Sequence, residues 1–163
     1  MRNIFVSILF LFLAACGGGS DAAAPTTAKV SIATTGTIPA GKVLVGAGVT
    51  IDLPTGVTPK LDANGTVDTS VITPSGVMLN AATVLTPIYT PASGATPGSL
   101  SFALASTAVG GFDSGEIATV SLQLAGGTTA TAASFTLSGV SLIDGQGASV
   151  AGMGATVSGV TLQ

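Results

Sequence analysis

The sequence predicts an all-β protein: a jelly-roll or immunoglobulin-like β-sandwich of about nine strands. In several stretches apolar residues alternate with small or polar ones, as in strands with one buried and one solvent-facing side. Turn-forming Gly, Pro, Asn and Asp residues separate these stretches. Long helical patterns are absent from the sequence. A parallel β-solenoid is the alternative, although the chain shows no fixed repeat of about 20–30 residues.

Four strands are indicated most clearly, and they follow one another along the chain. Their expected inward-facing residues are Val30 and Ile32, then Val43, Val45, Ala47, Val49, Ile51 and Leu53, then Leu100, Phe102 and Leu104, and then Val120, Leu122 and Leu124. Two later strands change phase in the middle, at Gly139 and at Gly159. A phase change at a glycine predicts a β-bulge. The pattern assigns no element to residues 78–85.

The composition indicates one folded domain with little charge. Ala, Gly, Thr and Ser supply about half of the 163 residues, yet 47% of the chain is apolar, whereas disordered chains are poor in apolar residues. The chain has no His and one Cys, which excludes His-based catalysis, His metal sites and an internal disulfide. Four Lys and Arg residues are too few for a nucleic-acid surface. We therefore expect no enzyme, no cofactor and no nucleic-acid partner.

The first residues are typical of an export signal. Met1-Arg2-Asn3 is followed by an apolar run, residues 4–13. As a helix this run would be only about 15 Å long, which is too short to cross a membrane. The sequence Leu13-Ala14-Ala15-Cys16 then resembles the lipobox of bacterial lipoproteins. The resemblance implies cleavage before Cys16, lipidation of its sulfur, and a location at the outer membrane or cell surface. The alternative is an ordinary secreted protein with a free thiol.

These features divide the chain into three parts. Residues 1–15 are the expected lipoprotein signal peptide. Residues 16–28, rich in Gly, Ser, Ala, Thr and Pro, are the expected flexible tether that follows the lipidated cysteine. Residues 29–163 are the expected β-sandwich. The partner implied by the first two parts is a membrane, bound through the lipid on Cys16.

Three segments carry a resemblance to cohesin domains. In 110–124, G-E-I-A-T-V-S-L-Q-L resembles the cohesin pattern G-x-I-A-x-V-x-F-x-V, and 135–150 resembles the following strand and turn. Residues 49–57 resemble the end of an earlier cohesin strand. The resemblance implies a sandwich shared with carbohydrate-binding modules and a non-catalytic role. The partner it implies is a protein of the dockerin kind, with polysaccharide binding as the alternative.

The acidic residues provide two weak candidate sites. Asp62, Asn64, Thr66 and Asp68 place oxygen ligands at alternate positions, as calcium-binding loops do, although an Asn-Gly turn with solvated acids explains the same residues. Asp113 and Glu116 have the spacing of a general acid and base, but a glycine-rich turn favours simple solvation.

Aromatic residues are the usual contacts of sugar-binding surfaces, and few follow the signal peptide. Phe102 and Phe135 are in phase with core residues, which leaves Tyr89 and Phe112 as the candidate ligand contacts. Two rings make a poor stacking platform. The sequence therefore favours a non-catalytic envelope lipoprotein whose sandwich binds or assembles with protein.

Overall fold

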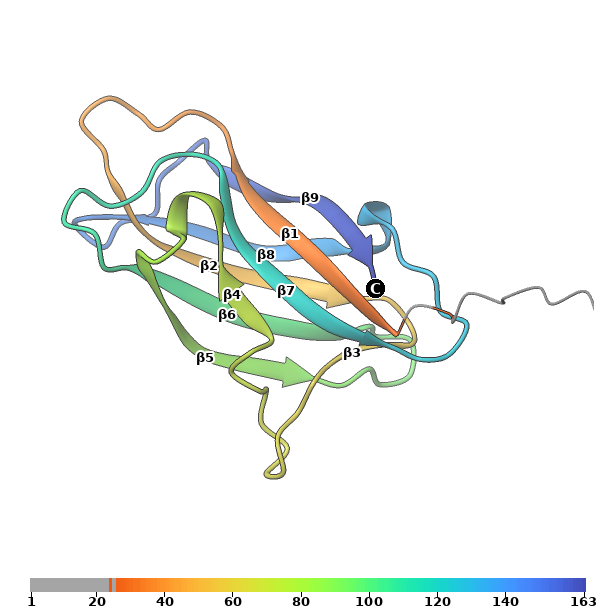
Figure 1. Cartoon of the computed structure of the whole chain (residues 1–163). Coiled ribbons are helices and arrows are strands. Elements are labelled where there is room, and N and C mark those ends of the chain that lie inside the picture. The colour runs from red at the N-terminus through yellow and green to blue at the C-terminus, as the bar shows by residue number, and fades with distance from the viewer. Residues whose placement is uncertain (1–23, 25) are drawn as a thin grey trace, which may run out of the picture.

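The computed structural model describes residue 24 and residues 26–163, and it confirms the predicted β-sandwich (Figure 1). One sheet, sheet A, contains β1 (Thr27–Thr35), β3 (Val57–Pro59), β4 (Ile72–Pro74), β7 (Glu116–Leu124) and β9 (Gly154–Leu162). The other, sheet B, contains β2 (Leu44–Leu53), β5 (Ala82–Thr90), β6 (Gly98–Ser106) and β8 (Thr136–Asp144). The predicted signal peptide and Cys16 lie outside the described residues.

All strand pairs in the two sheets are antiparallel. Sheet A has the order β3-β7-β1-β9, with β4 also pairing with β7, and sheet B has the order β5-β6-β2-β8. Two facing sheets replace the stacked coils of a solenoid, so that alternative is wrong. The first strand begins at Thr27, two residues before the predicted start of the sandwich.

The core lies between the sheets and consists of the inward-facing residues of both. The predicted inward-facing residues of β6 and β7 are all buried, as is the Met78 side chain from the single-turn 3-10 helix η1 (Gly76–Met78). Residues 78–85, unassigned by pattern, contain the end of η1 and the start of β5. A second short helix, η2 (Ala132–Ser134), precedes β8.

Both predicted phase changes are confirmed as bulges. On β8, Gly139 pairs with Thr50 and Leu137 with Ile51, so Ser138 is the extra residue. On β9, Gly159 pairs with Ser31 and Val157 with Ile32. After the bulge in β8 the alternation places Leu142 in the core, whereas after the bulge in β9 Val160 is half-buried and Leu162 is exposed.

The predicted burial of Val43 and Val45 is wrong. Val43 is 43% exposed, whereas Leu44 is fully buried. The pairing of β2 with β8 shifts between Leu44 and Gly46, so Val45 is the extra residue of a third bulge. A one-residue shift exchanges the two faces of a strand. The alternation that holds from Ala47 to Leu53 therefore does not continue back through Val45 to Val43.

Candidate functional site

The outer face of sheet B is the candidate functional site. Because alternate residues of β2 and β6 point into the core, the residues between them face outward, and most are small. The residues that line the shallow groove of about 460 Å³ over this face are Gly48, Val49, Thr50, Leu85, Ile88, Ser101, Phe102, Ala103, Gly139, Val140 and Ser141. Thr50 and Ser101 share a hydrogen bond of 2.9 Å across neighbouring strands, which fixes the centre of the floor.

Two glycines, Gly46 and Gly48, lie on the outer side of the central strand β2, and Gly48 lines the groove. Glycine inside a strand costs about 0.5–1 kcal/mol of stability relative to alanine. The backbone does not require glycine here, because a Cβ at Gly46 would lie 3.5 Å from the Leu104 oxygen and one at Gly48 would lie 3.8 Å from the Ser141 Cβ, both ordinary contact distances. Glycine inside a strand often marks a β-bulge or the close approach of another backbone or a ligand. Gly46 directly follows the bulge at Val45, whereas Gly48 pairs with Ser141 without a register shift and lines the groove.

Two exposed apolar side chains form one wall of the groove. Leu85 is 49% exposed and Ile88 is 62% exposed, and both point outward from the edge strand β5. The register of β5 shifts between them, at Thr86 and Pro87. This shift allows two large apolar residues only three positions apart to occupy the same face. An apolar wall beside a small-residue floor is typical of a surface that contacts another macromolecule.

The outer face of sheet A is different in chemistry. Its central strands β1 and β7 present outward Thr, Ser, Gln and Lys side chains, namely Thr27, Lys29, Ser31, Thr119, Ser121 and Gln123. Lys29 and Gln123 are long polar side chains whose ends stay in water, and this face has no exposed apolar pair like Leu85 and Ile88. Of the two faces, sheet B is therefore the better docking surface.

The sheet edges do not favour the addition of a partner's strand. Strands β3 and β4 have three residues each and end at Pro59 and Pro74. The other three edge strands are interrupted by register shifts, which lie at Pro87 in β5, beside Gly139 in β8 and beside Gly159 in β9. Proline and bulges prevent strand pairing at sheet edges. A protein partner would therefore bind a face rather than an edge.

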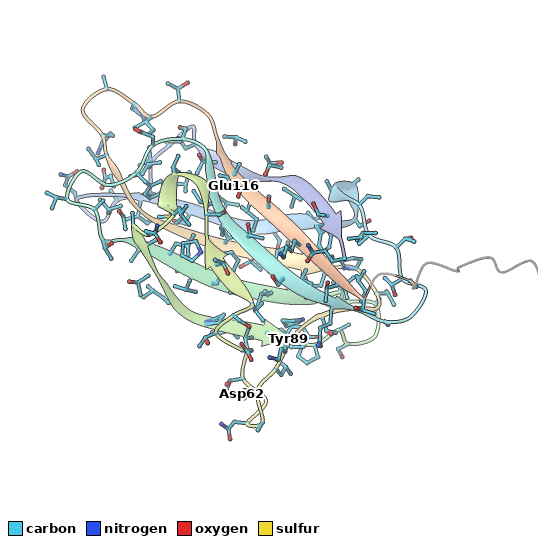
Figure 2. The ribbon with its side chains drawn as sticks, viewed as in Figure 1. Asp62, Tyr89 and Glu116 are labelled. Carbon is cyan, nitrogen blue, oxygen red and sulfur yellow. The ribbon has the colours of Figure 1, made fainter. Side chains whose placement is uncertain are left out.

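The two aromatic residues predicted as ligand contacts do not form an exposed pair. Phe112 is only 6% exposed, so its prediction as a surface ring is wrong. Gly111 has a φ of +69° and turns the chain inward, and the Phe112 N–H donates to the Leu44 carbonyl oxygen at 2.9 Å. Tyr89 is half-buried, pairs with the inward-facing Leu100, and lines a small cavity of about 230 Å³ at one end of the sandwich (Figure 2).

The four residues of the predicted calcium loop lie on the excursion between β3 and β4, with Asp62 near its tip (Figure 2). The Asp62 carboxylate accepts hydrogen bonds from the N–H of Asn64 and from the N–H and hydroxyl of Thr66, and these bonds hold its pKa below the usual value. These bonds brace the Asn64-Gly65 turn. Nowhere in the described chain do three or more His, Cys, Asp or Glu side chains gather as a metal site would need.

Asp68, the fourth residue of that loop, is held in a second set of contacts. Its carboxylate accepts hydrogen bonds from the hydroxyl and N–H of Ser70 and forms an ion pair with Lys60 at 2.9 Å. The bonds from Ser70, followed by Lys60, lower the pKa of Asp68. The carboxylates of Asp62 and Asp68 thus bind the loop's own donors.

Asp113 and Glu116 are not brought together as an acid and base. Asp113 is exposed, whereas Glu116 accepts a hydrogen bond of 2.6 Å from the Ser75 hydroxyl. Ser75 also accepts one from Thr119 at 3.3 Å. Sequence reasoning missed the Ser75–Glu116 contact, because 41 positions separate the two residues. Because Ser75 directly precedes η1, the contact holds the start of η1 against β7.

The other polar group missed by sequence reasoning is Asp144 at the end of β8. Its carboxylate is buried and forms an ion pair with Lys42, which comes from the loop before β2. It also accepts hydrogen bonds from the N–H groups of Gln146 and Ala148 at 3.0 and 2.9 Å. Lys42 and these donors lower the pKa of Asp144. The Asp144 carboxylate thus joins the loop that contains Lys42 to the turn that follows β8, and each of these contacts stabilises the fold.

Comparison of the chain with protein-family models, with curated proteins and with solved structures found no match. Within the part of the chain that the structure describes, no helix has the length and apolar character needed to span a membrane.

Proposed function

We propose that this protein is a non-catalytic, lipid-anchored envelope protein whose sandwich binds another protein on the outer face of sheet B. The observation that carries the proposal is the groove floor at Gly48, where glycine lowers the stability of the strand although a Cβ would fit. The Leu85 and Ile88 side chains beside it supply the apolar area that a partner would bury.

The blunted edges and the cohesin resemblance support the same mode of binding. Interrupted edges make strand addition unfavourable, which leaves a sheet face as the contact surface. Cohesins bind dockerin helices on one sheet face, so the resemblance implies a protein partner of that kind. Polysaccharide binding is the weaker alternative, because it relies on flat exposed rings and Phe102, Phe112 and Phe135 are buried.

Site-specific photo-crosslinking in the producing cells tests the docking surface. A photoreactive amino acid replaces Ser101 on the outer face of sheet B or, as the matched control, Ser121 on the outer face of sheet A. Both serines are half-buried and lie near the middle of a nine-residue strand. We expect a discrete protein adduct from position 101 that is at least about tenfold stronger than from position 121, because a docked partner excludes water from one face. Equal adducts from both positions, or none from either, would contradict the proposal.

The anchor is tested at Cys16. In the Cys16→Ser variant we expect nearly all of the protein to leave the detergent phase, because each methylene of the lost acyl chains contributes about 0.8 kcal/mol to membrane binding. Detergent phase partitioning and incorporation of labelled palmitate measure the effect. Ser20→Ala, a change in the expected tether, is the control and should behave as the parent protein. A Cys16→Ser protein that still partitions and still takes up palmitate would refute lipidation.

A further inference from the structure

The end of the sandwich at which β1 begins differs from the opposite end in the charge of its surface. The N–H groups of Thr26 and Thr27 both donate to the Gln163 carbonyl oxygen, at 2.9 and 3.0 Å, so the two ends of the described chain lie side by side there (Figure 1). The turns 54–56, 91–97 and 125–135 lie at the same end. We name this the near end, and the opposite end, with the loops 36–43, 107–115 and 145–153, the far end.

The three turns of the near end contain no Asp, Glu, Lys or Arg, and consist almost entirely of Thr, Ala, Ser, Gly and Pro. Along the described chain, the charged residues that lie nearest in sequence to these turns and to Thr26 are Lys29 on β1, Asp52 on β2 and Lys60 after β3. Lys29 is exposed, and Asp52 accepts a hydrogen bond of 2.8 Å from Ser138. Lys29 and Asp52 carry opposite charges, and Lys60 forms an ion pair with Asp68, so these charges balance.

The far end is acidic. Asp113 is exposed and Glu116 is half-buried, and the ion pairs of the described residues, Lys42–Asp144 and Lys60–Asp68, include neither of them. Two carboxylates at this end therefore lack a compensating cation. Bacterial membranes contain lipids with anionic headgroups. A surface of such headgroups repels carboxylates that lie within about one Debye length, roughly 8–10 Å.

We propose that the near end rests against the lipid surface, with the far end directed away from it. The inference depends on the proposed anchor at Cys16. A flexible chain of eleven residues, the length of 16–26, has a root-mean-square end-to-end distance of about 18 Å, whereas a nine-residue strand alone is about 30 Å long. The tether thus holds the near end close to the headgroups. This upright orientation leaves the outer face of sheet B open to a partner.

Fluorescence quenching from the lipid surface tests this orientation. Gly126→Cys at the near end and Gly110→Cys at the far end carry the same fluorophore, and a Cβ added at either position meets no atom within 4 Å. The lipidated protein is placed in vesicles of phosphatidylethanolamine and phosphatidylglycerol that contain a lipid with a headgroup-bound quencher. We expect quenching at position 126 to exceed that at position 110 by at least about threefold, since a strand length of about 30 Å separates the labels.

The outcomes separate the orientation from the anchor. Detergent partitioning of each labelled protein is measured first, and failure to partition would overturn both proposals. Partitioning with equal quenching at the two positions would overturn the orientation alone. Stronger quenching at position 110 would show instead that the far end, where Val43, Leu79 and Val109 are exposed, enters the lipid surface.

Discussion

The Gly111→Ala variant is expected to lose about 3–5 kcal/mol of folding free energy. Gly111 has a φ of +69°, a conformation that costs an alanine about 1–2 kcal/mol. The added Cβ would also collide with the Leu44 carbonyl oxygen and with the Val43 side chain. Because that carbonyl accepts the Phe112 N–H, the strain falls on the contact that brings the Phe112 ring into the core.

The neighbouring glycine provides the control. Gly110 has no positive φ, and a Cβ at this position meets no atom within 4 Å, so Gly110→Ala should change stability by less than about 0.5 kcal/mol. Urea denaturation of both variants measures the difference. Similar losses in the two would mean that the turn does not hold Phe112 as described.

The second large effect is expected at Leu44. Its side chain is fully buried, so Leu44→Ala should cost about 2–5 kcal/mol through lost burial and the cavity left behind. Val43→Ala, one residue earlier, should cost less than about 1 kcal/mol because Val43 is 43% exposed. Urea or thermal unfolding of the two variants measures both losses.

This pair of variants tests the bulge at Val45 directly. Uninterrupted alternation along 43–53 would place Val43 inside and Leu44 outside, and would reverse the two results. A larger loss for Val43→Ala would therefore contradict the observed register between β2 and β8.

Local patterns were sufficient for much of the architecture. The alternation in 100–104 and 120–124 identified the buried residues of β6 and β7, because side chains on a strand alternate between its two faces. The phase changes at Gly139 and Gly159 identified two bulges, because an extra residue reverses the alternation that follows it. The lipobox-like Leu13-Ala14-Ala15-Cys16 is likewise a local pattern, and lipidation is still a prediction that rests on it.

What the sequence alone determined is the fold class and most strand positions. The tertiary structure decided the rest. The burial of Phe112 depends on a hydrogen bond to Leu44, and the Lys42–Asp144 pair joins residues 102 positions apart. The groove depends on which strands are neighbours, since β2, β5, β6 and β8 each supply part of it. Such contacts join distant segments, and no local pattern encodes which segments will meet.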